Sequence, residues 1–341
     1  LTGLLDPFLD DARLVPIIET NRGCPYSCAF CCWGNAINSK VRQFSLETVL
    51  NEIEYIARRT KNPVKSLYIA DANFGIFKRD VEIAQLIKES SIKNGYPHNI
   101  YMYFAKNTDE KVVRIAEILK GLTDISMSKQ SLNKEVLKII RRDNISDEKY
   151  DVTYAKLREL GASSFCELIY GLPGEPLESF LDGFEKVAQR GLNPVIYPLL
   201  LIRGTEIDSE VFREKYQIKS VFRRIPRYTG TYNGINSVEY EEVVVSHSAF
   251  SRGDFFRVRL IQFLYWIFTG SGVIFSEWLK FLRDYELNIV SFIRYMVDDR
   301  RNWPVSFESL IGDFEAEARG ELIEEKDLKV EHTKEEIDTI R

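Results

Sequence analysis

Four of the five cysteines lie within nine positions, at Cys24, Cys28, Cys31 and Cys32, and only Cys166 lies elsewhere. Such a cluster indicates a metal site rather than a disulfide framework. The first three follow the spacing C-x3-C-x2-C and supply three thiolates. Three thiolates hold three irons of a cubane cluster and leave the fourth iron without a protein ligand. An iron that is open in this way is a reactive site.

Zinc is the main structural alternative for these thiols. A structural zinc ion needs four ligands, usually from two well-separated pairs, and the three histidines of the chain are all remote in sequence. Dithiol redox chemistry fits less well, because the motif uses three cysteines. One cubane has no need of Cys32, which we treat as a non-ligand, and Cys166 is expected to be a buried core thiol.

Composition limits the remaining classes of function. The 341 residues are 45% hydrophobic and 28% charged, with a net charge of −5, as in an ordinary soluble globular protein. This balance gives no reason to expect a nucleic-acid partner. The most apolar run, residues 260–268, is too short to span a bilayer, and we expect a buried helix there. Residues 1–14 contain no initiator Met and show no export signal, so we expect the chain to be part of a longer one.

Short apolar runs alternate with helical patterns up to residue 205, which predicts an α/β fold with parallel strands. The expected strands are Val15–Glu19, Ser66–Ala70, Ile100–Ala105, Asp124–Ser128, Phe165–Tyr170 and Val195–Leu201. The expected helices are Leu46–Arg59 capped by Ser45, a segment from Asp80 to Gly95, one after Asp109, Lys134–Arg142, Asp147–Leu160 and Glu178–Arg190. Six such units predict a partial (β/α)6 TIM-like barrel with its reactive groups at the carboxyl ends of the strands.

The pattern changes after residue 205. A loop is expected at residues 228–234, which are rich in Gly, Tyr and Asn, and a strand at residues 242–246. The remainder is patterned for helices. The predicted organisation is therefore a linker over 1–14, a catalytic core over 15–205 and an α-rich extension over 206–341.

With its strand context, the cysteine loop resembles the radical S-adenosylmethionine (SAM) superfamily. The sequence Cys24-x3-Cys28-x-Phe30-Cys31 after a strand matches the defining C-x3-C-x-aromatic-C motif. Four later elements resemble the superfamily in the correct order: DANFG at 71–75, SKQS at 128–131, ELIYGLPGE at 167–175 and PLLLIRGT at 198–205. The core over 15–205 is thus identified as a member of this superfamily.

The resemblance implies a [4Fe–4S] cluster on Cys24, Cys28 and Cys31, and SAM bound beside it. In the superfamily, an electron from the cluster cleaves SAM to a 5′-deoxyadenosyl radical that abstracts hydrogen from the substrate. The residues implied in binding these cofactors are Phe30, Asp71, Asn73, Ser128, Gln130, Glu167 and Ile169. No residue of this chain is assigned as an acid, base or nucleophile.

Several neighbouring polar and aromatic residues have simpler interpretations. Lys129, Gln130, Arg141 and Arg142 could be solvated residues flanking helices, and for the two arginines we expect this rather than binding of the SAM carboxylate. Tyr101 and Tyr103 are expected to form a core aromatic stripe, although they could face the substrate. Since side chains alternate along a strand, only one of Cys166 and Glu167 can point toward a ligand, and Glu167 would need a partner there.

The opening segment and residues 16–23 resemble members that carry an N-terminal cobalamin-binding domain. The expected function is a cobalamin-dependent C-methyltransferase acting on a small molecule, with a reductant such as flavodoxin or ferredoxin. One alternative is a radical SAM oxidoreductase or cyclase without methyl transfer. A different class is a non-enzymatic metal-binding module. An oxygen-sensitive cluster favours the cytoplasm.

Overall fold

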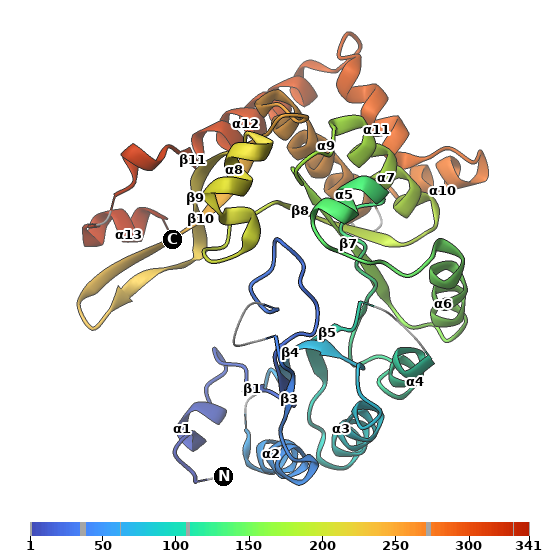
Figure 1. The fold of residues 1–341 in the computed structure, drawn as a ribbon, viewed down its shortest axis with the longest axis vertical. Helices are drawn as coiled ribbons and strands as arrows, with labels where there is room; N and C mark the ends of the chain where they lie inside the picture. Colours follow the sequence, from blue (N-terminus) through green and yellow to red (C-terminus); the bar gives the residue numbers. More distant parts are fainter. Residues whose placement is uncertain are drawn as a thin grey trace. The chain divides into compact units, whose positions relative to one another are not determined.

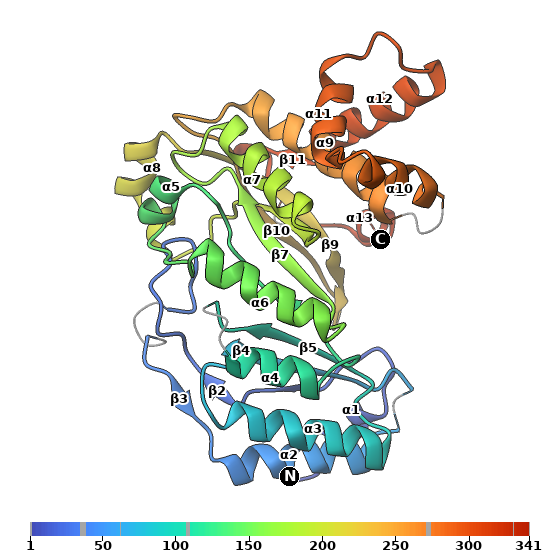
Figure 2. The ribbon, with the colours of Figure 1, turned by 90° about the vertical axis from the view of Figure 1, so that its right-hand side faces the viewer.

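The computed structural model describes residues 2–34, 39–61, 63–106, 110–270, 274–329 and 331–340. The chain forms two compact units, coloured along the sequence in Figures 1 and 2. The first comprises Leu1–Lys129 and Arg142–Glu167, and the second comprises Gln130–Arg141 and Leu168–Arg341. Residue 205, where a domain boundary is expected, lies inside the second unit.

Parallel strands form the centre of the first unit, as the alternating pattern predicts. Its strands are β1 (Ile17–Ile18), β4 (Ser66–Phe74), β5 (Asn99–Phe104), β6 (Ile125–Ser126) and the start of β7 (Ser164–Tyr170), with a small antiparallel pair of β2 (Asn21–Arg22) and β3 (Arg42–Gln43). The sheet order is β1-β4-β5, and β6 pairs in parallel with β7. Between β5 and β6, the Phe104 N–H donates to the Ser126 hydroxyl at 3.2 Å.

Helices cover one face of this sheet, with α2, α3 and α4 side by side in Figure 2. The helices are α1 (Asp6–Leu9), α2 (Leu46–Arg59), α3 (Asp80–Asn94), α4 (Glu110–Ile118) and α6 (Asp147–Glu159). The predicted cap of α2 is confirmed, because the Ser45 hydroxyl accepts the Thr48 N–H at 3.1 Å. Gly95, with φ +61°, ends α3 as expected. Asp109, expected just before α4, lies outside the described residues.

The side chains of β5 alternate between two environments. Ile100, Met102 and Phe104 face inward and are buried. Tyr101 and Tyr103 are 50% and 49% exposed, so the expected core aromatic stripe is wrong. The reason is the period of two along a strand: only every second side chain meets the helices.

A long antiparallel hairpin in the second unit replaces the loop expected at residues 228–234. β9 (Lys219–Tyr232) pairs with β10 (Ile235–Ser246), and β11 (Leu322–Ile323) adds to the other edge of β9. Asn233 and Gly234 make the turn with φ of +50° and +81°. Both positive values are those of a two-residue hairpin turn, for which Asn-Gly is a favoured sequence. The expected strand at residues 242–246 is confirmed as part of β10.

The rest of the second unit combines the end of β7 with β8 and a helical C-terminal region. Its other elements are α5 (Lys134–Ile139), α7 (Leu177–Gln189), β8 (Asn193–Pro198), 3-10 helix η2 (Glu206–Asp208), α8 (Glu210–Tyr216), α9 (Arg252–Gly270), α10 (Ser276–Asp284), α11 (Ile289–Asp298), α12 (Val305–Gly320), 3-10 helix η3 (Glu325–Asp327) and α13 (Lys334–Ile340). β8 extends a sheet of order β6-β7-β8. The chain is thus an α/β protein with parallel strands and a helical C-terminal region.

Helix α9 confirms the buried helix expected at residues 260–268. Leu264 and Phe268 are among its buried side chains, and Tyr265 packs against Phe184 of α7 with ring centroids 5.1 Å apart. Its Gln262 side chain donates to the Ile196 carbonyl of β8 at 2.8 Å. No helix in the described ranges is both long and apolar enough to cross a membrane.

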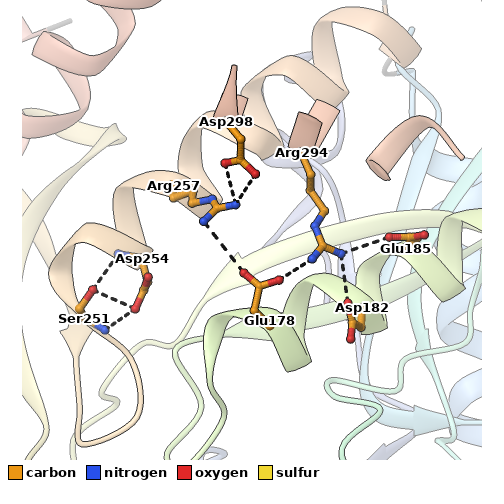
Figure 3. Close-up of polar contacts among 8 residues, drawn as sticks. All are labelled: Glu178, Asp182, Glu185, Ser251, Asp254, Arg257, Arg294 and Asp298. Atoms are coloured by element: carbon orange, nitrogen blue, oxygen red, sulfur yellow. Dashed lines mark hydrogen bonds and ion pairs between the residues drawn. The ribbon is translucent and has the colours of Figure 1, made fainter. Parts of the chain in front are cut away.

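An ion-pair network ties α7 to the C-terminal helices (Figure 3). Arg294 of α11 reaches three carboxylates of α7: Glu178, Asp182 at 3.0 Å and Glu185 at 3.2 Å. Arg257 of α9 pairs with Asp298 of α11 at 2.8 Å. The network orients α7, α9 and α11 relative to one another, while the apolar packing of α9 supplies most of the stabilisation.

Candidate functional site

The cysteine loop lies between β2 and β3. Cys24 is buried, Cys28 and Cys31 are half-buried, and all are free thiols. The Cys31 N–H donates to the Cys28 carbonyl at 3.1 Å, which curls the loop between the two. Gly34 lies so close to the Tyr26 carbonyl that a Cβ would stand 1.7 Å from that oxygen. The loop therefore folds back on itself only because residue 34 has no side chain.

A buried carboxylate anchors the chain where it enters this loop. Asp71 accepts hydrogen bonds from the N–H groups of Thr20 and Asn21 at 2.7 and 3.2 Å. The side-chain amide of Asn21, at 2.6 Å, and the Thr20 hydroxyl also donate hydrogen bonds to Asp71. Burial raises the pKa of Asp71, and these donors oppose that rise. Asp71 thus holds the approach to the cysteines; its predicted contact with SAM stays a prediction.

Asn73 touches the predicted metal ligands directly. Its Nδ2 donates a hydrogen bond to Cys24 Sγ at 3.1 Å. Asp71 and Asn73 are both buried and lie two residues apart on β4, so they share one face of the strand. One strand thereby fixes both the entry of the loop and its first cysteine.

Two cations stand beside the thiols. The Arg142 guanidinium interacts electrostatically with Cys28, and its nitrogens donate to the Ser128 carbonyl at 2.5 Å and to Asn144 Oδ1 at 2.9 Å. Lys106 interacts electrostatically with Cys28 and Cys24, and burial lowers the pKa of its ammonium group. Positive charge beside a thiol favours the thiolate, which is the form that binds iron.

The expectation that Arg142 is solvated is therefore wrong, and of the two interpretations left open for Lys129 the solvated one does not hold. Arg142 is only 7% exposed, whereas Arg141, with φ +52°, points to solvent and pairs with Glu206 at 2.7 Å. Lys129 is buried with its Nζ 4.2 Å from the centre of the Tyr150 ring and pairs with Asp147. Both buried cations satisfy their charge with oxygen, sulfur or ring partners, which sequence spacing does not reveal.

Glu167 and Cys166 point to opposite faces of β7, as the alternation of side chains along a strand requires. Cys166 is fully buried, which confirms the expected core thiol, and Glu167 is half-buried. Glu167 accepts a hydrogen bond from the Ser128 hydroxyl at 2.5 Å. These two predicted SAM contacts therefore touch each other across β6 and β7, while their contact with SAM stays a prediction.

The other predicted SAM contacts belong to the second unit. Gln130 adopts a left-handed conformation with φ +65°, and its carbonyl accepts the Ile169 N–H at 2.8 Å. Gln130 Oε1 is buried without a hydrogen-bond partner among the described residues. Gly171 and Gly174 both have positive φ, and a Cβ at Gly174 would stand 2.9 Å from Ile139 Cδ1. The glycines thus let the turn after β7 pack against α5.

The three cysteines offer thiol groups, the type of ligand that holds iron–sulfur clusters. No three His, Cys, Asp or Glu side chains of the described ranges gather closely enough to hold one metal ion. The Cys31 thiol nevertheless interacts electrostatically with Cys28 and Cys24, so the three lie near one another. Burial raises the pKa of Cys31 to about 11, so a bound metal must displace its proton. Phe30 is half-buried between two of these cysteines, and Cys32 is exposed.

Comparison with known proteins decides the family. The model of the radical SAM superfamily matches residues 18–209, more than half of the chain and all of the motifs above. The chain belongs to the radical SAM superfamily. Membership implies the [4Fe–4S] cluster and SAM as cofactors, in agreement with the donor set.

Two curated relatives of this radical SAM chain share about a third of its residues. The cobalamin-dependent radical SAM methyltransferase TokK of Streptomyces tokunonensis is 34% identical over 266 residues, which is 74% of this chain and 38% of TokK. The 2-(S-pantetheinyl)-carbapenam-3-carboxylate methyltransferase of Streptantibioticus cattleyicolor is 35% identical over 268 residues, 75% of this chain and 38% of that enzyme. The chain thus spans well under half the length of these relatives.

A solved structure supports the same fold. The radical SAM methyltransferase TsrM of Kitasatospora setae, solved with cobalamin and a [4Fe–4S] cluster, aligns with a TM-score of 0.51 at 17% identity. The alignment covers 60% of this chain and 39% of TsrM. At this identity the likeness concerns the fold alone.

Sequence reasoning missed three residues at the radical SAM site: Thr20 and Asn21, which bind Asp71, and Arg142. Thr20 and Asn21 directly precede the cysteine loop. The signal that could have found them is Asp71, because a carboxylate on a buried strand needs hydrogen-bond donors. Arg142 had no such signal, because its neighbour Arg141 has the same side chain and the opposite environment.

Proposed function

We propose that this chain is the catalytic part of a cobalamin-dependent radical SAM methyltransferase that methylates a carbon of a small molecule. Two relatives at 34% and 35% identity, both named as methyltransferases, carry this proposal. The one named for its substrate acts on a carbapenam carboxylate. A bicyclic β-lactam carboxylate is therefore the first substrate to test.

In this proposal, Cys24, Cys28 and Cys31 hold the cluster. When bound, the cluster and SAM supply the radical that takes a hydrogen atom from the substrate, and cobalamin supplies the methyl group. Asn73 donates a hydrogen bond to Cys24 Sγ, and Arg142 places positive charge near Cys28, which holds the thiolates in place and draws electron density from them. Asp71 keeps the loop seated on β4.

SAM is proposed to contact Phe30, Asp71, Asn73, Ser128, Gln130, Glu167 and Ile169. The Ser128–Glu167 pair offers a carboxylate to hydroxyl groups such as those of a ribose. Gln130 offers its unpartnered Oε1, and the glycines after Ile169 admit a flat ring close to the backbone.

We also propose that the six parallel strands form the partial barrel of the superfamily. Their β/α order and the likeness to TsrM support this arrangement. A flavodoxin or ferredoxin is the proposed reductant, and the cytoplasm the proposed compartment, because reduced iron–sulfur clusters need a low potential and protection from oxygen.

The test uses the full-length protein, purified and reconstituted without oxygen. We would incubate it with methyl-deuterated SAM, cobalamin, a reductant and 2-(S-pantetheinyl)-carbapenam-3-carboxylate, and analyse products by mass spectrometry. A deuterated methyl group on the substrate together with 5′-deoxyadenosine is expected. The Cys28→Ala variant should abolish both products, whereas Cys32→Ala, which changes the exposed neighbour, should retain them.

Other outcomes point to the alternatives. If 5′-deoxyadenosine forms and the substrate is oxidised or cyclised without gaining deuterium, the chain is a radical SAM oxidoreductase or cyclase. A cluster whose electron paramagnetic resonance (EPR) spectrum ignores SAM would contradict the enzyme proposal and favour a metal-binding module.

A further inference from the structure

A closed ring of hydrogen bonds in the second unit joins the turn after β6 to the turn after β7 and to the first turn of α7. The Ser131 hydroxyl donates to Glu175 Oε1 at 2.6 Å and accepts the Asn133 N–H at 3.0 Å. Asn133 Nδ2 donates to the Ser179 hydroxyl at 2.9 Å, and this hydroxyl donates to the same Glu175 oxygen at 3.4 Å. The hydroxyl groups of Ser131 and Ser179 thus each donate their one proton in a hydrogen bond to Glu175.

Burial of Glu175 at the centre of this ring costs folding free energy. It is 2% exposed, and its second oxygen, Oε2, has no hydrogen-bond partner among the described residues. Burial raises its pKa to about 7, and only the hydroxyls of Ser131 and Ser179 oppose that rise. A half-satisfied buried carboxyl group destabilises the fold compared with an apolar side chain, so its use here is positional.

The ring borders a strained residue. Gln130 directly precedes Ser131 and has φ +65°, a strained conformation for a residue other than glycine. Such a conformation persists only where its surroundings over-determine it. Ser131, fixed by Glu175 on one side, and the Ile169 N–H, bound to the Gln130 carbonyl at 2.8 Å on the other, provide that constraint.

Asn133 extends the ring into a helix, and the glycine turn adds a packing contact. Asn133 Oδ1 caps α5 by accepting the N–H groups of Glu135 at 3.0 Å and Val136 at 3.3 Å. Gly174, which directly precedes Glu175, packs against Ile139 at the other end of α5. The two turns are thus held together both by polar contacts and by van der Waals contact.

We propose that Glu175 is a positioning residue that clamps these two turns together and so presents Gln130 and Ile169 to SAM. The proposal rests on the proposed function, because Gln130 and Ile169 are its SAM contacts. Glu175 acts through Ser131 and takes no part in the chemistry. Its loss should therefore weaken SAM binding while leaving the cysteine loop able to assemble its cluster.

The experiment compares four variants of the full-length protein with reconstituted cluster. Glu175→Ala breaks the ring, and Ser131→Ala removes its main donor. Glu175→Gln keeps an acceptor oxygen for Ser131 and is the conservative rescue. Glu135→Ala is the matched control, because it removes an exposed glutamate from the first turn of α5. For each variant we would measure the SAM dissociation constant by equilibrium dialysis, the KM and kcat of SAM cleavage, and the iron content.

Glu175→Ala and Ser131→Ala should raise the dissociation constant and the KM for SAM about tenfold, the effect of one lost buried hydrogen bond. Their kcat and iron content should stay near those of wild type. Glu175→Gln and Glu135→Ala should bind SAM within about twofold of wild type. If Glu175→Ala does not fold, Ser131→Ala and Glu175→Gln carry the same comparison.

Two results would overturn the proposal. The first is SAM binding unchanged in both Glu175→Ala and Ser131→Ala; the second is an equal loss in Glu135→Ala. Failure of the wild-type protein to bind SAM at all is a different outcome, because it removes the proposed function itself.

Discussion

The side-chain amide of Asn73 donates a hydrogen bond to the sulfur of Cys24 at 3.1 Å. A strand residue and the first ligand of the cysteine loop are thus in direct contact across 49 positions of sequence. Amide donors to ligand sulfurs hold the ligand in place and lower its electron density. Under the proposed ligand set, this contact couples the cluster to β4 by a side chain, and not only by the loop that carries the cysteines.

Removing this donor should loosen the cluster. Asn73→Ala is expected to lose iron to a chelator about tenfold faster than wild type, because partners of metal ligands contribute that much to metal retention. The rate is read from the decay of cluster absorbance under an anaerobic atmosphere. Asn51→Ala, an exposed asparagine on α2, is the control and should match wild type. Equal rates for Asn73→Ala and wild type would show that the contact does not persist once iron is bound.

Arg141 and Arg142 form a natural matched pair for testing charge beside the cluster. Arg142→Met removes a buried cation that interacts electrostatically with Cys28, so reduction should become harder and the midpoint potential more negative. Arg142→Lys keeps the charge and should fall between Arg142→Met and wild type. Arg141→Met removes an exposed cation and should leave the potential unchanged. An EPR-monitored redox titration measures all four proteins; a common potential would contradict the assignment.

Asp71 should matter both for the cysteine loop and for the stability of the fold. In Asp71→Asn, one acceptor oxygen becomes a donor and faces the Thr20 and Asn21 groups that now donate to it. Loss of charged hydrogen bonds of this kind costs about 2 kcal/mol or more. We expect a lower free energy of unfolding and substoichiometric iron, measured by anaerobic urea titration and iron analysis. Asp124→Asn, at an exposed aspartate before β6, should behave as wild type.

Glu175 should also make stability depend on pH. Its pKa in the folded protein, about 7, exceeds the ordinary value of 4.5, so between these values the folded chain keeps a proton that the unfolded chain releases. The contribution of Glu175 to stability is therefore full below pH 4.5 and falls as pH rises to 7. Relative to wild type, Glu175→Gln should gain melting temperature between pH 5 and about 8. A difference that stays constant with pH would show that Glu175 titrates normally.

The fold up to residue 205 was predictable because its signals are local. Each of the six expected strands overlaps an observed strand, and the Ser45 cap and the Gly95 stop lie where side-chain chemistry requires them. The hairpin at β9 and β10 was missed because the Tyr, Thr and Gly residues around Asn233 suit either a loop or a twisted strand. The Asn-Gly pair is a signal for a hairpin turn, but the Gly, Tyr and Asn content of residues 228–234 led to the expectation of a loop.

The site was predictable where spacing sets the chemistry and not where burial does. The three cysteines are a local pattern, and the family match confirms the motif that contains them. The burial of Arg142 and of Lys129 depends on how distant segments pack, which no window of sequence contains. The exposure of Tyr101 and Tyr103 on β5 was missed for a related reason. The alternation of side chains defines two faces of a strand, but only tertiary packing decides which face is covered.

The exposure of Cys32 has a practical side. An accessible thiol beside three ligand thiols is a ready partner for cross-linking when a preparation meets air. Loss of iron would then be followed by disulfides within the loop and between molecules, and chelation would become irreversible without a reductant. Cys32→Ala should therefore give a protein that tolerates storage and cluster reconstitution better than wild type, and it is the form of choice for crystallisation.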